Sequence, residues 1–234
     1  MVAIANGAPQ QSSEEGYSIS FVPVGSKSGI RWEGEITDAI ALASDPKALP
    51  PRFLSIRQGE KLVQRFSTLN RASDPVQILP GNLEIYASQH GGSDVSPELF
   101  NRVQIPQQPG HYDLFLTRHP QEEGWKKVLS FLVPGGRDAF PNSHVRVVNM
   151  SGFKAASKIN NLVSEIEPKG VALVPLRGEA VTIQCAYLDQ DEWRLVMRTR
   201  ISQEDGARIT VVFYPSRDPR APLGAATYFQ PETD

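Results

Sequence analysis

The sequence predicts an all-β protein made of two tandem antiparallel β-sandwich domains, immunoglobulin-like or transthyretin-like, with one or two short helices. Three observations support this fold class. Apolar and polar residues alternate in many short segments, which is the pattern of half-buried strands. The 19 prolines and 18 glycines among 234 residues are spread along the chain, as turns between short strands require. Finally, similar strand and loop patterns recur in the two halves of the sequence.

The predicted strands begin at residue 17. In 17–21 aromatic or aliphatic residues alternate with serine, and a turn at 25–29 leads to a second alternating segment at 30–33. Each alternating segment has one apolar face, and an antiparallel sheet buries that face against a second sheet. The same reasoning predicts further strands at 52–57, 61–67, 75–79, 83–88, 101–105, 111–118, 125–133, 143–149, 171–176, 180–188, 192–201 and 206–214.

Two segments have helical features. Residues 36–43 (ITDAIALA) predict a short helix that ends before an Asp-Pro pair. Between residues 153 and 166 apolar side chains recur three or four apart, and Ser151 precedes them as a candidate N-cap. Two asparagines and several β-branched residues in the same stretch favour a strand and a loop instead. The sequence leaves both interpretations of 153–166 open.

The two halves of the chain resemble each other. VQIPQQPGHYDLFL (103–116) and ALVPLRGEAVTIQC (172–185) both contain a strand, a proline, a loop with glycine and an alternating strand, and a tryptophan follows each. RFLSIRQG (52–59) and HVRVVNMSG (144–152) form a second pair. Such self-similarity predicts a duplication. The expected divisions are a disordered lead-in over 1–16, a first domain over 17–137 and a second domain over 138–234.

Residues 144–214 resemble a family of bacterial cell-envelope domains. Their opening HVRVVNMS, a proline–glycine loop and the late ARITVVFY are similar to that family's opening strand (like VRVVN) and closing strand (like YTVV). The resemblance implies an extracytoplasmic immunoglobulin-like or transthyretin-like sandwich, often repeated in tandem. The family has no settled activity, so the resemblance implies no functional residue.

The composition argues against several classes of function. Twenty-four basic and 26 acidic residues leave a formal charge of −2, and no run of Lys and Arg provides the basic surface that nucleic acids bind. No stretch has the roughly 20 apolar residues that a transmembrane segment needs. The single cysteine, Cys185, lies on the apolar face of a predicted strand, so we expect a buried thiol and no internal disulfide.

The N-terminal residues bear on location. Residues 1–8 lack the charged start and the long apolar stretch of a secretory signal, and residues 9–16 are polar. Either the protein is cytoplasmic, or a signal peptide preceded this sequence and was removed. A polar extension before a strand-rich body favours the second alternative, with a periplasmic or secreted protein.

A row of arginines is the first candidate ligand-binding feature. With strict alternation, Arg194, Arg198 and Arg200 share one face of a strand. A flat row of guanidinium groups can bind carboxylates, phosphates or acidic sugars. The alternative is a solvent-facing strand whose charges prevent edge-to-edge aggregation. The opposite face of this strand would carry Trp193, Leu195, Met197 and Ile201.

The tryptophans are the second candidate feature. Trp32 and Trp193 align with apolar neighbours, so we expect both in the core. Trp125 follows a turn and is the residue expected to be exposed. Carbohydrate-binding sandwiches use exposed aromatic rings as platforms for sugars. The predicted ligand-binding residues are therefore Arg194, Arg198, Arg200 and Trp125.

Catalytic and metal sites have weaker support. His111 and Asp113 lie two residues apart and share a strand face, as a general base or a metal site would require. No nucleophile or further ligand accompanies them, so we expect surface positions. The acidic turn at 189–192 lacks the glycine and the distant glutamate of a calcium loop. The sequence thus predicts no catalytic residue, no metal and no cofactor.

Three functions follow, in order of preference. The first is a non-catalytic binding or structural module of a bacterial cell envelope, with a protein or a polysaccharide as partner. The second is a carbohydrate-binding accessory module that uses an exposed aromatic such as Trp125. The third is a hydrolase whose site gathers distant residues such as His111 and Asp113.

Overall fold

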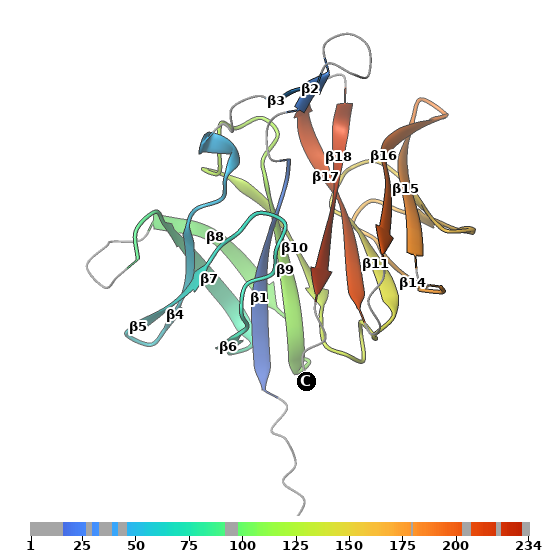
Figure 1. Cartoon of the computed structure of the whole chain (residues 1–234). Coiled ribbons are helices and arrows are strands. Elements are labelled where there is room, and N and C mark those ends of the chain that lie inside the picture. Colours follow the sequence, from blue (N-terminus) through green and yellow to red (C-terminus); the bar gives the residue numbers. More distant parts are fainter. Residues whose placement is uncertain are drawn as a thin grey trace, which may run out of the picture.

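The computed structural model shows a chain built almost entirely of β-strands (Figure 1). It describes residues 16–26, 30–32, 39–41, 46–91, 98–178, 180–202, 207–218 and 221–230. The predicted lead-in over 1–16 lies outside these residues except for Gly16.

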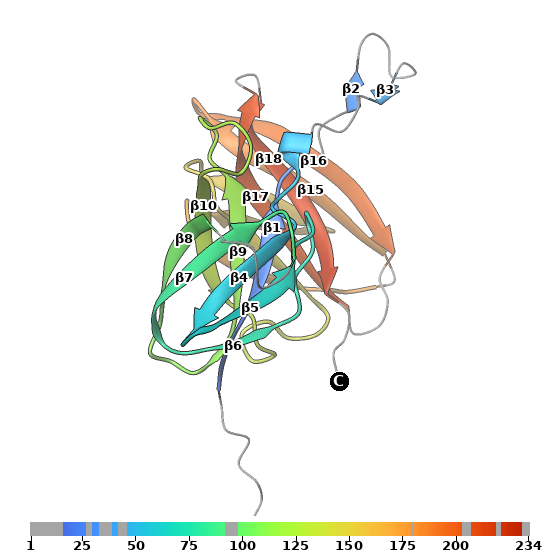
Figure 2. The same ribbon diagram turned by 90° about the vertical axis from the view of Figure 1, so that its left-hand side faces the viewer.

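The first half of the chain forms two four-stranded sheets that pack face to face. We call them inner sheet 1 and outer sheet 1. Inner sheet 1 has the strand order β10 (Val128–Pro134), β9 (Gly110–Arg118), β1 (Tyr17–Val24) and β6 (Val76–Ile78). Outer sheet 1 has the order β5 (Lys61–Phe66), β4 (Phe53–Gln58), β7 (Gly81–Ser88) and β8 (Glu98–Ile105). Figure 2 looks onto outer sheet 1, with strands of the second half behind it.

The second half repeats this arrangement strand for strand. Inner sheet 2 has the order β14 (Val171–Pro175), β11 (His144–Asn149), β17 (Arg208–Asp218) and β18 (Ala221–Gln230). Outer sheet 2 has the order β13 (Leu162–Ile166), β12 (Ala155–Ile159), β15 (Ala180–Asp189) and β16 (Glu192–Ser202). The prediction of two tandem β-sandwiches is confirmed.

The strand pairing differs from the prediction in one respect. Each inner sheet contains a parallel pair: β1 lies beside β9 with Tyr17 opposite Gly110, and β11 lies beside β17 with Val145 opposite Ile209. The other strand pairs among the described residues are antiparallel. Because parallel neighbours need a long crossover, the whole outer sheet is inserted between the two strands of each parallel pair.

The repeat is real, but the predicted alignment of its halves is wrong. Residues 103–116 cover β8 and β9, whose counterparts in strand order are β16 and β17. Residues 172–185 instead cover β14 and β15, the counterparts of β6 and β7. Alternating strands with a proline and a glycine between them are too alike to fix which hairpin matches which. The predicted boundary at 137/138 falls between β10 and β11, and the domain limits stay a prediction.

The helix predicted for 36–43 is contradicted at the residues described there, and for 153–166 the strand-and-loop interpretation is the correct one of the two. Residues 39–41 form strand β3 (Ala39–Ala41), which pairs with β2 (Ile30–Trp32), and the rest of 36–43 lies outside the described residues. Residues 153–166 form the β12–β13 hairpin, with Asn160 at φ 52° in its turn. Asparagine tolerates this left-handed conformation, and pairing with β15 outweighs the helical spacing. The helix among the described residues is the three-residue 3₁₀ turn η1 (Pro46–Ala48).

Three apolar layers hold the four sheets together. The layer between outer and inner sheet 1 contains Phe21 and Ile85, and the one between inner and outer sheet 2 contains Val147 and Cys185. A third layer joins the two inner sheets. It contains Val22, Val24, Phe115 and Val133 from the first half, and Val148, Met150, Val212, Tyr214, Ala226 and Tyr228 from the second. The inner sheets are therefore buried on both faces.

The thiol of Cys185 is fully buried in the second of these layers, as the sequence predicts. Its pKa is raised to about 12 because burial disfavours the thiolate. A thiol in this state is a small apolar core group and a poor nucleophile.

Candidate functional site

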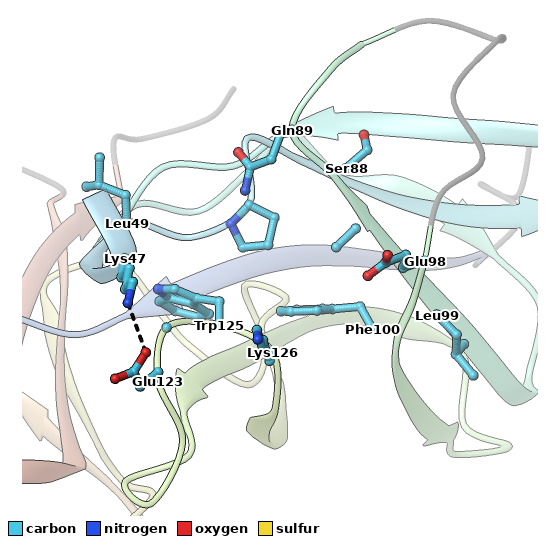
Figure 3. Close-up of a pocket in the computed structure, with 13 residues that line it drawn as sticks. Lys47, Leu49, Ser88, Gln89, Glu98, Leu99, Phe100, Glu123, Trp125 and Lys126 are labelled. Atoms are coloured by element: carbon cyan, nitrogen blue, oxygen red, sulfur yellow. Dashed lines mark hydrogen bonds and ion pairs between the residues drawn. The ribbon is translucent and has the colours of Figure 1, made fainter. Parts of the chain in front are cut away.

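An open cleft of about 710 Å³ lies on the first half, between η1, the β7–β8 hairpin and the β9–β10 loop (Figure 3). Strand ends and loops form its walls, while the two sheets behind it hold these walls in place. Its lining residues are Lys47, Leu49, Pro51, Ala87, Ser88, Gln89, Glu98, Leu99, Phe100, Glu123, Gly124, Trp125 and Lys126. We refer to this feature as the cleft.

Trp125 forms part of the cleft wall but is only 7 % exposed, so the prediction of an exposed ring is wrong. Its indole N–H donates a 3.0 Å hydrogen bond to the carbonyl of Ala48 in η1. This bond and the packing of the ring against the first-half core hold it in place. The turn before Trp125 gave no sign that η1, some 77 residues earlier in the chain, would cover it.

The rim of the cleft combines apolar and charged groups. Leu49 and Leu99 are both half-exposed at its mouth. Lys47 and Glu123 form a 2.9 Å ion pair across one end, and the hydrogen bond from Lys47 lowers the pKa of Glu123. Figure 3 shows this pair beside Trp125, with Glu98 and Leu99 toward the other end. The cleft can thus take an amphipathic group that offers both an apolar surface and hydrogen bonds.

The arginine row has a different composition from the one predicted. β16 contains a bulge: Met197 lies opposite Cys185, but the next residue of β15, Ala186, lies opposite Leu195. The extra residue, Val196, reverses the alternation beyond it. Arg198 and Arg200 therefore share the solvent side of outer sheet 2 with Leu195 and Trp193.

Trp193 and Leu195 are accordingly exposed, at 45 % and 65 %, where strict alternation predicts core positions. Arg194 is on the other side, opposite Tyr187, and its Nε lies 3.1 Å from a carboxylate oxygen of Asp189. Two of the three predicted arginines, Arg198 and Arg200, thus share one face, and Trp193 lies on that face where Arg194 was expected. The side chain of Trp32 lies outside the described residues.

Asp113 is fully buried between the inner sheets, so the prediction of a surface position is wrong for it. One carboxylate oxygen accepts a 2.6 Å hydrogen bond from Nη2 of Arg146, a residue of the second half that is itself only 1 % exposed. The other oxygen lies 3.3 Å from Nε2 of His111. Burial would raise the pKa of Asp113, but the hydrogen bond from His111 and the charge of Arg146 outweigh it, so the pKa is lowered.

Arg146 is held on several sides. Its guanidinium donates to the carbonyl of Pro134 at 3.1 Å and lies 4.3 Å from the ring centroid of Phe140. A Cβ at Gly135 would lie 2.7 Å from a carboxylate oxygen of Asp113, so the backbone of this connection packs directly on the ion pair. The sequence did contain a signal, an arginine among valines in HVRVV. The acid that pairs with it is a residue the sequence placed at the surface.

Other chemistries find no support in the described part of the chain. Among those residues, no three His, Cys, Asp or Glu side chains come together in a way that could hold a metal ion. No helix there has the length and apolar character needed to cross a membrane. His111 and Asp113 do lie together, yet the carboxylate of Asp113 forms the ion pair with Arg146 and does not line the cleft.

Comparison with known proteins adds little. No family model matches the sequence, and no curated protein matches it. A solved structure with some likeness is that of a DUF3823 family protein from Bacteroides ovatus ATCC 8483, at 7 % identity over 81 % of this chain and 100 % of that one. Its TM-score of 0.22 is too low to support an argument about fold details or function.

Proposed function

We propose that this protein is a non-catalytic binding module of a bacterial cell envelope, and that its ligand enters the cleft. The observation that supports this proposal is the cleft itself. It combines exposed leucines and an aromatic wall with a small number of polar groups at the rim, which is the usual make-up of a ligand site. The rigid sandwich behind it fixes the positions of loops that carry the contacts.

The binding role is favoured over catalysis by the groups in the cleft. Its acids are Glu98 and Glu123, and Glu123 is engaged with Lys47. Among the described lining residues there is no histidine, and the serine there, Ser88, donates its hydroxyl proton to the carbonyl of His90. The part of the lining that the structure describes contains no nucleophile with an adjacent base, as hydrolases use.

A carbohydrate ligand is the second candidate function, and the exposed indole of Trp193 favours it. Trp125, the residue from which the sequence predicted such a platform, has its ring buried against η1. A sugar platform would therefore be on outer sheet 2 rather than in the cleft.

The cleft is tested by NMR on methyl-labelled full-length protein titrated with soluble envelope fragments, namely muropeptides and envelope oligosaccharides. We expect methyl shifts at Leu49 and Leu99 with at least one fragment class. Leu99→Glu puts a charge at the mouth of the cleft and should abolish those shifts. Leu79→Glu, a matched change at an exposed leucine outside the cleft, should leave them intact.

Two results would contradict the proposal. Shifts absent from Leu49 and Leu99 with all fragments, or unchanged by Leu99→Glu, would remove the cleft as the binding site. A change in the mass of any fragment after incubation with the protein would show turnover and contradict a non-catalytic role.

A further inference from the structure

The solvent side of outer sheet 2 carries three cations in adjacent rows. In an antiparallel sheet, residues opposite each other point to the same side. Lys158 on β12 lies opposite Gln184 on β15, and Gln184 lies opposite Arg198 on β16. Arg200 occupies the next row, opposite Thr182. We call this surface, together with Trp193 and Leu195, the basic face.

The cations of the basic face are not neutralised by the rest of the described chain. Lys158, Arg198 and Arg200 form no ion pair with any of the residues that the structure describes. Nearby cations behave differently: Arg194 pairs with Asp189, and Lys154 lies 2.6 Å from Glu165. Glu165, an acid on this side, is already engaged, so no described acid is paired with the three cations.

An apolar region adjoins the cations. Trp193 and Leu195 are exposed, and Val163, beside Lys158, is 64 % exposed. Trp193 lies opposite Leu188, four residues along β15 from Gln184. At ~3.3 Å per residue the indole is therefore about 13 Å from the row that contains Arg198. This side of outer sheet 2 thus offers a ring for stacking and two guanidinium groups at a distance that an extended chain can span.

We propose that the basic face binds an anionic polysaccharide. One sugar ring of the chain stacks on Trp193, and carboxylates of other sugars along the chain bind Arg198 and Arg200. Guanidinium groups bind carboxylates through paired, charge-assisted hydrogen bonds, and indole rings stack on the apolar faces of sugars. The inference rests on the proposed role as a binding module, but it uses a surface separate from the cleft.

The acidic turn beside Trp193 favours a narrow chain over a membrane surface. Asp189, Asp191 and Glu192 lie at the β15–β16 turn, next to the indole. An anionic bilayer seated on Trp193 would bring its headgroups against these carboxylates, and like charges repel. A single polysaccharide strand brings only one carboxylate per sugar near this turn, so it meets less repulsion than a bilayer with many headgroups.

The test compares polygalacturonate with its fully methyl-esterified form, which keeps the sugar backbone and removes the charge. Binding of the full chain is measured by affinity electrophoresis and calorimetry. We expect binding of polygalacturonate alone, weakened as salt rises from about 0.05 M to about 0.5 M. Arg198→Gln with Arg200→Gln should weaken it by about tenfold or more.

Matched variants separate the basic face from general charge and from the cleft. Arg102→Gln removes an exposed arginine from β8, the counterpart of β16, and should leave binding unchanged. Trp193→Ala should weaken binding, and Trp193→Phe should restore most of it. Leu99→Glu should have no effect, so loss of cleft binding and loss of polysaccharide binding are distinguishable.

Several outcomes would overturn the proposal. The first is no binding of polygalacturonate at low salt, and the second is equal binding of the esterified form. The third is an Arg102→Gln effect as large as that of the double variant. The fourth is arginine-dependent binding to vesicles with anionic lipids in the absence of polysaccharide binding, which would assign the face to a membrane.

Discussion

Asp113 and Arg146 place opposite charges in the layer between the inner sheets, where water cannot compensate either one. Such a pair contributes little net stability over an apolar pair of similar volume, but removal of one partner leaves the other charge buried. Because Asp113 belongs to β9 and Arg146 to β11, the pair also fixes how the two halves fit together.

Asp113→Asn should lower the free energy of unfolding at neutral pH by about 3–5 kcal/mol, because it leaves the guanidinium of Arg146 unpaired. The loss should shrink in acid. The pKa of Asp113 is lowered in the folded state, so its contribution is complete above the unfolded-state pKa of about 4 and disappears as the pH falls through the folded-state value. Urea denaturation of the wild type and the variant at pH 7 measures the loss of stability, and the same comparison at pH 3 measures how far this loss shrinks.

The double variant Asp113→Leu with Arg146→Met is the control for this prediction. It removes both charges and should cost less than the single change, because no buried charge is left alone. If the double change costs as much as the sum of the single changes, or if Asp113→Asn keeps the same pH dependence as the wild type, the ion pair does not act as described.

The thiol of Cys185 should resist labelling in the native protein. Its raised pKa of about 12 leaves almost no thiolate at pH 8, and the side chain is fully buried. A fluorescent maleimide should therefore react only as fast as the protein opens, and at once in urea. Rapid labelling of the native protein at pH 8 would contradict the buried position.

At the scale of strands, the sequence predicted most elements but not the face that each side chain takes. The alternation in 17–21, 111–118 and 180–188 corresponds to real strands, although only β15 buries a single face, whereas β1 and β9 are buried on both. In β16 the same rule failed at Val196, since a bulge adds one residue without leaving a mark in the pattern. This is why Trp193 was expected in the core and Arg194 among the exposed arginines.

Strand β18 was missed altogether. Its sequence, APLGAATYFQ, contains a proline, a glycine and three alanines, all residues with low strand propensity. Pairing with β17 along almost its whole length outweighs that propensity.

The cleft was not predicted either. Its walls come from η1, β8 and a loop far apart in the chain, and only their packing brings them together.

The glycine in β18 has a specific packing role. A Cβ at Gly224 would lie 2.5 Å from the ring of Tyr214 on the neighbouring β17. Gly224→Ala should therefore lower the free energy of unfolding by about 1–3 kcal/mol through overpacking. Thermal or urea denaturation gives the value. Combination with Tyr214→Leu should relieve most of the additional cost, and a neutral Gly224→Ala would contradict the close approach.

At the scale of the whole molecule, the two sandwiches share a core. Inner sheet 1 and inner sheet 2 bury apolar side chains against each other, and the connection between the halves packs there with Phe140 fully buried. Independent domains joined by a linker normally have smaller, more polar contacts. We therefore expect the halves to unfold together rather than one at a time.

This cooperativity can be measured with 5-fluorotryptophan, whose NMR signals report Trp125 in the first half and Trp193 in the second. Both signals should change at the same urea concentration. Val148→Asp buries a charge in the shared layer and should shift both midpoints, at a cost above about 3 kcal/mol. Leu79→Asp, at an exposed position, is the control. Separate midpoints in the wild type would contradict a shared core.

The parallel pairs have a consequence for how this protein is made. During synthesis the ribosome releases β1 well before β9 and β11 well before β17, so neither inner sheet can close until most of its half has emerged. All strands of the first half are present once β10 has emerged, yet Val22 and Phe115 stay uncovered until the second half is made. Before the second half is made, the nascent chain therefore exposes an apolar surface that other chains can bind. Until β18 is present and the second half covers this surface, it favours aggregation of the incomplete chain.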